Sequence, residues 1–123
     1  MSDSVLFVGT YDIPRDGVDA FYSQMATMDE LIRDQEPRVV FIGHYVNEDE
    51  TEGTSIHLHP DAASFDFHMA TASSAISAGN QIVKVKRIEF YGKPSDSVVA
   101  QLSGAFDVRV KTWAGGLSRI DWP

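Results

Sequence analysis

The sequence predicts an α+β fold, because short strand-like runs alternate with two longer runs of helical periodicity. The strand-like runs are rich in β-branched and aromatic residues, and the helical runs repeat apolar residues at intervals of three and four. The length of 123 residues suits one domain with a real core. The composition, 43% hydrophobic and 23% charged, is that of a globular protein. We therefore expect a single domain over residues 1–123.

The first strand and the first helix occupy the N-terminal part of the chain. Residues 5–13 read as a strand that ends at Pro14. Asp16 and Gly17 then offer a turn, and apolar residues recur at helical spacing up to the break before Pro37. This pattern predicts an amphipathic helix that covers one face of a sheet.

A β-hairpin is predicted next. Residues 38–46 form its first strand, residues 54–59 its second, and the polar stretch 47–53 turns the chain between them. The tip of this hairpin is acidic. Because the tip is a turn and not a pocket, its carboxylates read as a solvated surface rather than as a catalytic pair; they are Glu48, Asp49, Glu50 and Glu52.

The second helix and the fourth strand complete the core. Asp61 is a plausible N-cap for a helix from Ala62 to about Ser77, closed by Gly79 and Asn80. Residues 81–91 alternate as a fourth strand. The order strand, helix, strand, strand, helix, strand is the ferredoxin-like pattern, with its core at about 5–92.

Residues 93–123 form a C-terminal extension, predicted as a short helix through Leu102 and a fifth strand over 106–113. Two helices cover only one face of a four-stranded sheet, so dimerisation through the other face is the simplest way to bury it. The fifth strand either extends a sheet edge or crosses to the partner. Trp113 and Trp122 are natural anchors at that contact.

Charge and composition exclude several kinds of partner and chemistry. A formal net charge of −8 disfavours nucleic acid and anionic membrane surfaces. No apolar run approaches the roughly 20 residues of a membrane span, and the first residues lack the basic start of a signal peptide, so we expect a cytoplasmic protein. The chain has no cysteine, which removes thiolate metal sites and cysteine nucleophiles.

The segment 56–71, IHLHPDAASFDFHMAT, resembles the signature segment of the antibiotic biosynthesis monooxygenase superfamily. There a strand runs into an acidic-Ala-Ala helix start, followed by a histidine and an apolar residue. The resemblance covers roughly residues 5–92 and implies a homodimeric α/β barrel with a pocket between each sheet and its own helices. It also implies that His68 points into that pocket.

The chain departs from this superfamily at other functional positions. Where the haem-degrading branch has an asparagine and a tryptophan, this sequence has Gly9–Thr10 and Phe65 or Phe67, so haem degradation is not expected. His57 stands where many members carry an acid on the third strand. Only His68 is therefore carried over from the resemblance.

His68 is the candidate catalytic base, because an imidazole titrates near neutral pH. The alternative is a histidine that is simply hydrogen-bonded between helix and sheet. Candidate substrate-binding residues share its inward stripe or can orient and stack on an aromatic ligand: Tyr11, His44, Phe65, Met69, Asn80 and Trp113. No nucleotide cofactor is predicted, since Gly115–Gly116 lacks the rest of a phosphate-binding motif.

His57 and His59 lie two residues apart on a strand, so they face the same side at a separation of roughly 7 Å, with His44 on the adjacent strand. This group is a minor candidate for metal binding, but its spacing matches no known metal motif. Ordinary polar contacts on the sheet are the simpler interpretation, so no metal is predicted.

Three functions are compatible with these observations. The first is a cofactor-independent monooxygenase that acts on a small hydrophobic or aromatic metabolite. The second is an isomerase or cyclase that uses the same pocket without consuming oxygen. The third is a non-catalytic dimer that binds a small molecule.

Overall fold

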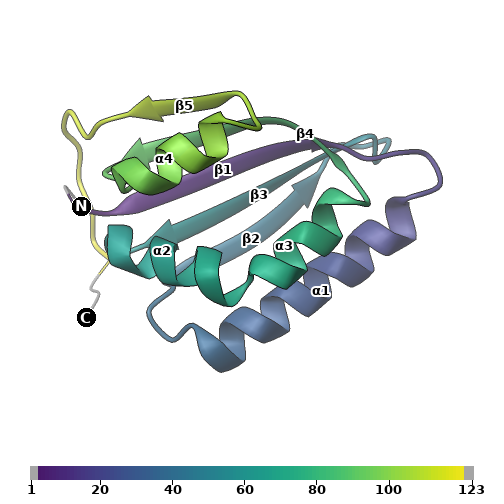
Figure 1. Cartoon of the computed structure of the whole chain (residues 1–123), viewed down its shortest axis with the longest axis horizontal. Coiled ribbons are helices and arrows are strands. Elements are labelled where there is room, and N and C mark those ends of the chain that lie inside the picture. The colour runs from purple at the N-terminus through teal and green to yellow at the C-terminus, as the bar shows by residue number, and fades with distance from the viewer. Residues whose placement is uncertain (1–2, 121–123) are drawn as a thin grey trace.

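One mixed β-sheet organises the computed structural model, which describes residues 3–120. Its strands lie in the order β2-β3-β1-β4-β5, antiparallel except for the parallel pair β4–β5. The predicted ferredoxin-like order is confirmed, and the fifth strand extends the sheet at the β4 edge (Figure 1). The strands are β1 (Val5–Asp12), β2 (Phe41–Val46), β3 (Glu52–His59), β4 (Lys84–Gly92) and β5 (Val108–Lys111).

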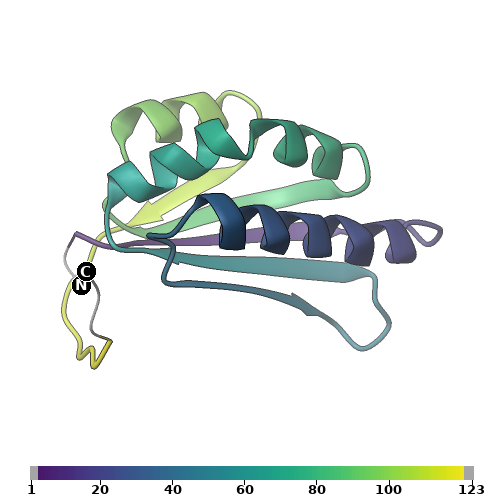
Figure 2. The same ribbon diagram turned by 90° about the horizontal axis from the view of Figure 1, so that it is seen from below.

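All the helices of the described chain pack on the same face of this sheet (Figure 2). The helices are α1 (Val18–Gln35), α2 (Ala62–Thr71), α3 (Ser73–Asn80) and α4 (Asp96–Ser103). The larger core cluster joins β1, β4, α2 and α4, and the smaller joins α1 to the start of α3. Their buried members are Val5, Phe65, Ile88, Phe90, Val98 and Leu102 in the first, and Met28, Ile32 and Ala72 in the second.

The second predicted helix is in fact two helices, so the prediction of one helix from Ala62 to Ser77 was wrong. Asp61 caps its start as predicted, because its carboxylate accepts from the Ser64 amide at 3.0 Å. The break falls at Ala72, which is fully buried and leaves helical geometry at φ −96° and ψ 10°. No glycine or proline marks this bend, which turns Ala75 and Ile76 onto the cluster beside α1.

Several strand boundaries also differ from the prediction. Residues 38–40 precede β2, because the Val39 amide makes a turn bond to the Glu36 carbonyl. Residues 81–83 precede β4, because Ile82 and Val83 donate to the Gly79 carbonyl. β3 starts earlier than predicted, and β5 covers only four residues of the predicted 106–113.

The opposite face of the sheet carries no helix within residues 3–120, and it is partly apolar. Phe41 and Tyr45 are 44% and 52% exposed there. Both rings lie over Gly43, where a Cβ would come within 2.7 Å of Phe41 Cζ and 3.0 Å of Tyr45 Oη. Strand alternation turns Ile42 and His44 toward the helices, which leaves Phe41 and Tyr45 on the other face.

The chain after β5 runs without regular structure toward the face that lacks helices (Figure 2). Trp113 is 41% exposed in this segment, and its ring packs beside Gly116. Trp122 lies outside the described residues. No helix of the described chain is long and apolar enough to cross a membrane.

Candidate active site

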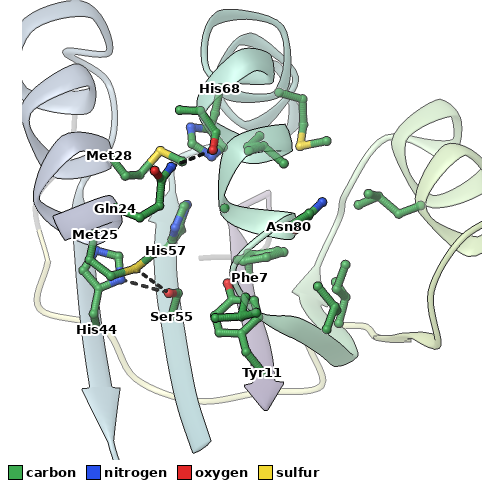
Figure 3. Close-up of a pocket in the computed structure, with 18 of the residues that line it drawn as sticks. Phe7, Tyr11, Gln24, Met25, Met28, His44, Ser55, His57, His68 and Asn80 are labelled. Carbon is green, nitrogen blue, oxygen red and sulfur yellow. Dashed lines mark hydrogen bonds between the residues drawn. The ribbon is translucent and has the colours of Figure 1, made fainter. Parts of the chain in front are cut away.

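A cavity of about 100 Å³ lies between the sheet and its helices (Figure 3). A cavity of roughly 150 Å³ can hold benzene, so this one suits a group of about one aromatic ring or a short acyl chain. Its wall is mostly apolar, with a few polar side chains. The predicted site residues that line it are Tyr11, His44, Phe65, His68, Met69 and Asn80, together with His57 from the predicted histidine pair.

Trp113 is not among the residues that line the cavity. It lies beyond β5, in the segment that leaves the sheet, so the structure does not bring it together with the other candidates. His59 is also absent from the lining, although it is fully buried just behind it. The seven lining residues named above therefore define the candidate site.

His68 projects from α2 and is paired with a buried carboxylate. Its Nδ1 lies 2.9 Å from Glu36 Oε1 and 3.0 Å from Oε2, and the two side chains are only 4% and 1% exposed. A carboxylate has only acceptor atoms, so Nδ1 donates and Nε2 is the ring nitrogen left with a lone pair. Glu36 thereby fixes the tautomer in which His68 can accept a proton from a ligand.

His57 and His59 lie next to His68, but no carboxylate of residues 3–120 is hydrogen-bonded to either of them. The ring centroid of His57 is 4.9 Å from that of His68, and the ring centroid of His59 is 5.9 Å from it. Burial lowers the pKa of His57 well below its usual value and that of His59 to about 3, so both are neutral at pH 7. His57 Nδ1 and His59 Nε2 are buried without a hydrogen-bond partner.

These histidines are near neighbours, yet they do not form a metal-binding arrangement. Within residues 3–120, no group of three or more His, Cys, Asp or Glu side chains is placed to hold a metal ion. Their rings pack against one another and against Phe7 and Phe65 as aromatic groups. Their place in the structure is the wall of the cavity and the core behind it.

A second histidine–carboxylate pair lies at the other side of the cavity. His44 Nε2 is 2.6 Å from Asp29 Oδ1, and His44 Nδ1 is 2.9 Å from Ser55 Oγ. His44 and Ser55 are direct partners across the β2–β3 ladder, and Asp29 reaches them from α1. Ser55 is almost fully buried at 2% exposure, whereas the Asp29 side chain is 40% exposed.

Tyr11 lies on β1, which pairs with β3, and it interacts with Ser55. Its hydroxyl folds back over Gly9, where a Cβ would meet Tyr11 Oη at 2.7 Å, and Gly9 is the direct β-ladder partner of Ser55. Burial raises the pKa of Tyr11, opposed by its interaction with Ser55. The phenol is therefore protonated at neutral pH and can donate a hydrogen bond into the cavity.

The sequence predictions did not identify three residues of these networks: Glu36, Asp29 and Ser55. Strand alternation could have identified Ser55, because Ser55 lies on the same strand face as His57 and His59. Asp29 falls on the same helix stripe as Met25 and Met28, which also line the cavity. Glu36 gave no signal, since the last residue before a proline reads as an exposed helix end.

Comparison with solved structures shows what this fold resembles. MupZ from Pseudomonas fluorescens superposes with a TM-score of 0.83 over 95% of each chain, at 19% sequence identity. SnoaB, a cofactor-independent oxygenase from Streptomyces nogalater, gives a TM-score of 0.64 over 76% of this chain and 95% of its own, at 16% identity. A proposed antibiotic biosynthesis monooxygenase from Caulobacter crescentus gives 0.66 over 76% and 92%, at 12% identity.

The matched structures differ in how much of this chain they cover. A match over 76% of the chain has about the length of residues 5–92, whereas one over 95% has to include most of residues 93–123. No sequence-family model and no curated protein sequence matches the chain. The resemblance predicted from residues 56–71 is thus confirmed at the level of structure: the chain has the fold of the antibiotic biosynthesis monooxygenases.

Proposed function

We propose that this protein is a homodimeric, cofactor-independent oxygenase that acts on a small hydrophobic or aromatic metabolite, with His68 as its general base. The observation that carries the proposal is the buried His68–Glu36 pair at the wall of a largely apolar cavity. The fold is shared with a protein named as a cofactor-independent oxygenase.

The proposed reaction begins with proton transfer to His68 Nε2. The proton comes from a phenol or from an activated carbon of the bound substrate, and the Glu36 carboxylate stabilises the imidazolium that forms. His68 and Glu36 are both almost fully buried, which strengthens this interaction. The substrate is left as an electron-rich anion in an apolar site.

Dioxygen is the oxidant in the next step. The substrate carbanion gives its electrons to dioxygen and a C–O bond forms, yielding a peroxide. Loss of water from this peroxide leaves a carbonyl, so that a CH₂ group and O₂ become C=O and H₂O. The electrons come from the substrate itself, and the protein has to supply only the base, the position and the apolar cavity.

The oxygen-uptake test uses metal-stripped protein with single-ring phenols and hydroquinones as probes, because the cavity has room for about one aromatic ring. We expect uptake to match product formation, and His68→Ala to reduce the rate by about 10²–10⁴-fold, as is typical of a general base. Glu36→Gln keeps the shape but not the charge and should give an intermediate loss. Glu30→Gln removes an exposed carboxylate from the same helix and is the matched control.

Other outcomes of this test contradict the proposal in distinct ways. Product formation without oxygen uptake indicates an isomerase or cyclase that uses the same base. Binding of the probes without turnover, unchanged by His68→Ala, indicates a non-catalytic binding protein. Binding is measured separately as a rise in melting temperature with ligand concentration.

The proposed dimer buries the helix-free face of the sheet around Phe41 and Tyr45. Exposed aromatic side chains on an otherwise uncovered sheet favour such an interface. Light scattering after size exclusion should give a dimer at micromolar concentration, and Phe41→Asp should give a monomer. Phe67→Asp changes a phenylalanine of α2 that is 52% exposed and is the matched control. A monomeric wild-type protein would contradict this part of the proposal.

A further inference from the structure

We propose that Ser55, His44 and Asp29 form a nucleophilic relay through which the cavity hydrolyses small acyl esters or thioesters. This activity is separate from the base chemistry of His68 and needs no oxygen. It rests on three side chains from three elements that meet at one end of the cavity: Ser55 from β3, His44 from β2 and Asp29 from α1. Figure 3 shows Ser55 and His44 facing each other at the cavity wall.

The polarity of this chain of hydrogen bonds is the one that a serine nucleophile requires. The Asp29 carboxylate only accepts, so at 2.6 Å it holds the proton of His44 on Nε2. The other ring nitrogen, Nδ1, then offers its lone pair to the Ser55 hydroxyl at 2.9 Å. Nucleophile, base and orienting acid stand in the same order as in serine hydrolases, with the two ring nitrogens exchanged.

The Ser55 hydroxyl has two other neighbours: Tyr11, whose protonated phenol can donate to Ser55 Oγ, and Met25. Met25 Sδ lies 3.7 Å from Ser55 Oγ. A thioether is a weak acceptor, and this distance is long, so the imidazole nitrogen at 2.9 Å is the stronger partner. The hydroxyl proton is therefore directed to the base.

The surroundings suit a nucleophile on a small apolar substrate. Ser55 lies in a wall that includes apolar neighbours such as Met25, Met28 and Phe7, and the cavity of about 100 Å³ has room for a short acyl chain. Tyr11 places a protonated hydroxyl over Gly9, directly across the β-ladder from Ser55. A donor in that position can stabilise the oxyanion that forms when Ser55 attacks a carbonyl carbon.

The steps balance without any further reactant except water. Ser55 Oγ bonds to the acyl carbon while its proton passes to His44 Nδ1. The C–O or C–S bond to the leaving group breaks, and the leaving alcohol or thiol takes that proton. Water then attacks the acyl-serine, gives one proton to His44 and releases the carboxylic acid, after which Ser55 Oγ regains its proton.

The first experiment measures hydrolysis of p-nitrophenyl acetate and p-nitrophenyl butyrate in oxygen-free buffer, with an S-acetyl thioester as a second probe. We expect turnover by the wild-type protein and a loss of about 10²–10³-fold in kcat/KM for Ser55→Ala and for His44→Gln. Asp29→Asn should lose about ten- to a hundredfold. Ser74→Ala and Asp19→Asn alter exposed residues of α3 and α1 and should leave the rate unchanged.

The ester and thioester probes distinguish the two possible natural substrates. Faster turnover of the oxygen ester points to an esterase, and faster turnover of the thioester points to a thioesterase. Either result supports the relay, provided that Ser55→Ala abolishes it. Hydrolysis that survives in both Ser55→Ala and His44→Gln overturns the proposal.

A second variant tests the relay even if Ser55→Ala does not fold well. The wild-type chain has no cysteine, so Ser55→Cys introduces a single thiol at the site. If His44 accepts the proton of residue 55, that thiol should react with iodoacetamide at least tenfold faster near pH 6.5 than in Ser55→Cys with His44→Gln added. The other titratable groups around the cavity, Tyr11, His57 and His68, are the same in both proteins.

The alkylation result separates a functional relay from a purely structural hydrogen bond. A structural role predicts the same pH profile of alkylation with and without His44, and that outcome overturns the proposal. A profile shifted to lower pH by His44 supports it. Mass spectrometry of the wild-type protein after a p-nitrophenyl ester should also locate an acyl group on the peptide that contains Ser55.

Discussion

The two histidine–carboxylate pairs on the cavity make the same kind of hydrogen bond in different surroundings. His68 and Glu36 are both almost fully buried, at 4% and 1% side-chain exposure, and join α2 to the end of α1. His44 and Asp29 are 14% and 40% exposed and join β2 to the middle of α1. The same chemistry is therefore enclosed at one end of the cavity and open to solvent at the other.

This difference in burial should make one pair important for stability and the other mainly for reactivity. A buried pair has given up its hydration, so the Glu36 carboxylate and the His68 N–H depend on each other for a hydrogen-bond partner. A partly exposed pair interacts weakly in free energy, because water solvates and screens both groups. We expect changes at Glu36 to affect both folding and proton transfer, and changes at Asp29 to affect almost only proton transfer.

Glu36→Ala should produce the largest loss of stability. It leaves the Nδ1–H of His68 buried without its acceptor, which costs about 1–3 kcal/mol, and the cavity left by the buried Glu36 side chain adds to this loss. The free energy of unfolding is measured by urea titration at pH 7.5. Glu30→Ala, an exposed change on the same helix, should stay within about 0.5 kcal/mol. A loss below about 1 kcal/mol for Glu36→Ala would mean that solvent reaches the pair.

Sequence patterns were sufficient to predict the sheet order and the cavity face of α2. Alternation and helical periodicity indicate on which side of an element a residue lies. Phe65 of α2 and His57 and His59 of β3 are buried on the side that these patterns predict. The break at Ala72 escaped prediction because it depends on how α3 packs against α1 rather than on any helix-breaking residue. The exposure of Phe41 also could not be predicted, because a strand pattern does not tell which apolar face the chain's own helices cover.

The carboxylate partners escaped prediction for a different reason. The His68–Glu36 contact joins residues 32 positions apart, and the His44–Asp29 contact joins residues 15 apart, so neither pairing leaves a local motif. Histidines can be recognised as candidates from residue type alone. Whether each one is hydrogen-bonded to an acid is decided by tertiary packing, which gives one to His68 and another to His44 but, within residues 3–120, none to His57 or His59.

His57 and His59, which are buried and not bonded to a carboxylate of residues 3–120, should make the protein less stable in acid. The pKa of His57 and His59 in the folded protein lies below their unfolded value of about 6.5, so the unfolded chain binds more protons as the pH falls. Their contribution is complete above about pH 6.5 and decreases below it. At pH 5.5 we expect a loss of about 1.4 kcal/mol from each residue relative to pH 7.5.

Urea titrations at pH 7.5 and 5.5 measure this effect, with His57→Leu as the informative variant. The leucine removes a ring nitrogen that has no partner and should reduce the acid-dependent loss by about half. Carboxylates with lowered pKa, such as Asp61 and Glu89, act at lower pH and are common to both proteins. An unchanged pH dependence in His57→Leu would show that His57 is already solvated in the folded state.

Gly9→Ala should have a smaller effect that is concentrated at the Ser55 end of the cavity. The added Cβ would lie 2.7 Å from Tyr11 Oη and 3.1 Å from Phe7 Cζ, so both rings have to move. Overpacking of this kind costs about 1–3 kcal/mol. Ester hydrolysis should fall about tenfold as the Tyr11 hydroxyl is displaced.

A matched glycine provides the control for this change. At Gly104 the nearest atom to an added Cβ is 3.5 Å away, and the backbone φ of −69° suits any residue. Gly104→Ala should therefore leave stability within about 0.5 kcal/mol and hydrolysis unchanged. Equal losses in the two variants would contradict the position assigned to Tyr11.

The smallest expected effect on stability is that of Asp29→Ala, at most about 1 kcal/mol in the urea titration. Its partner His44 stays solvated at one edge and keeps its bond to Ser55, so no buried charge is left uncompensated. Raising the salt concentration to about 1 M should reduce even this difference, because the pair lies within reach of counterions. A loss as large as that of Glu36→Ala would show that both pairs are structural, and it would remove the reason to treat the Ser55 end of the cavity as the reactive one.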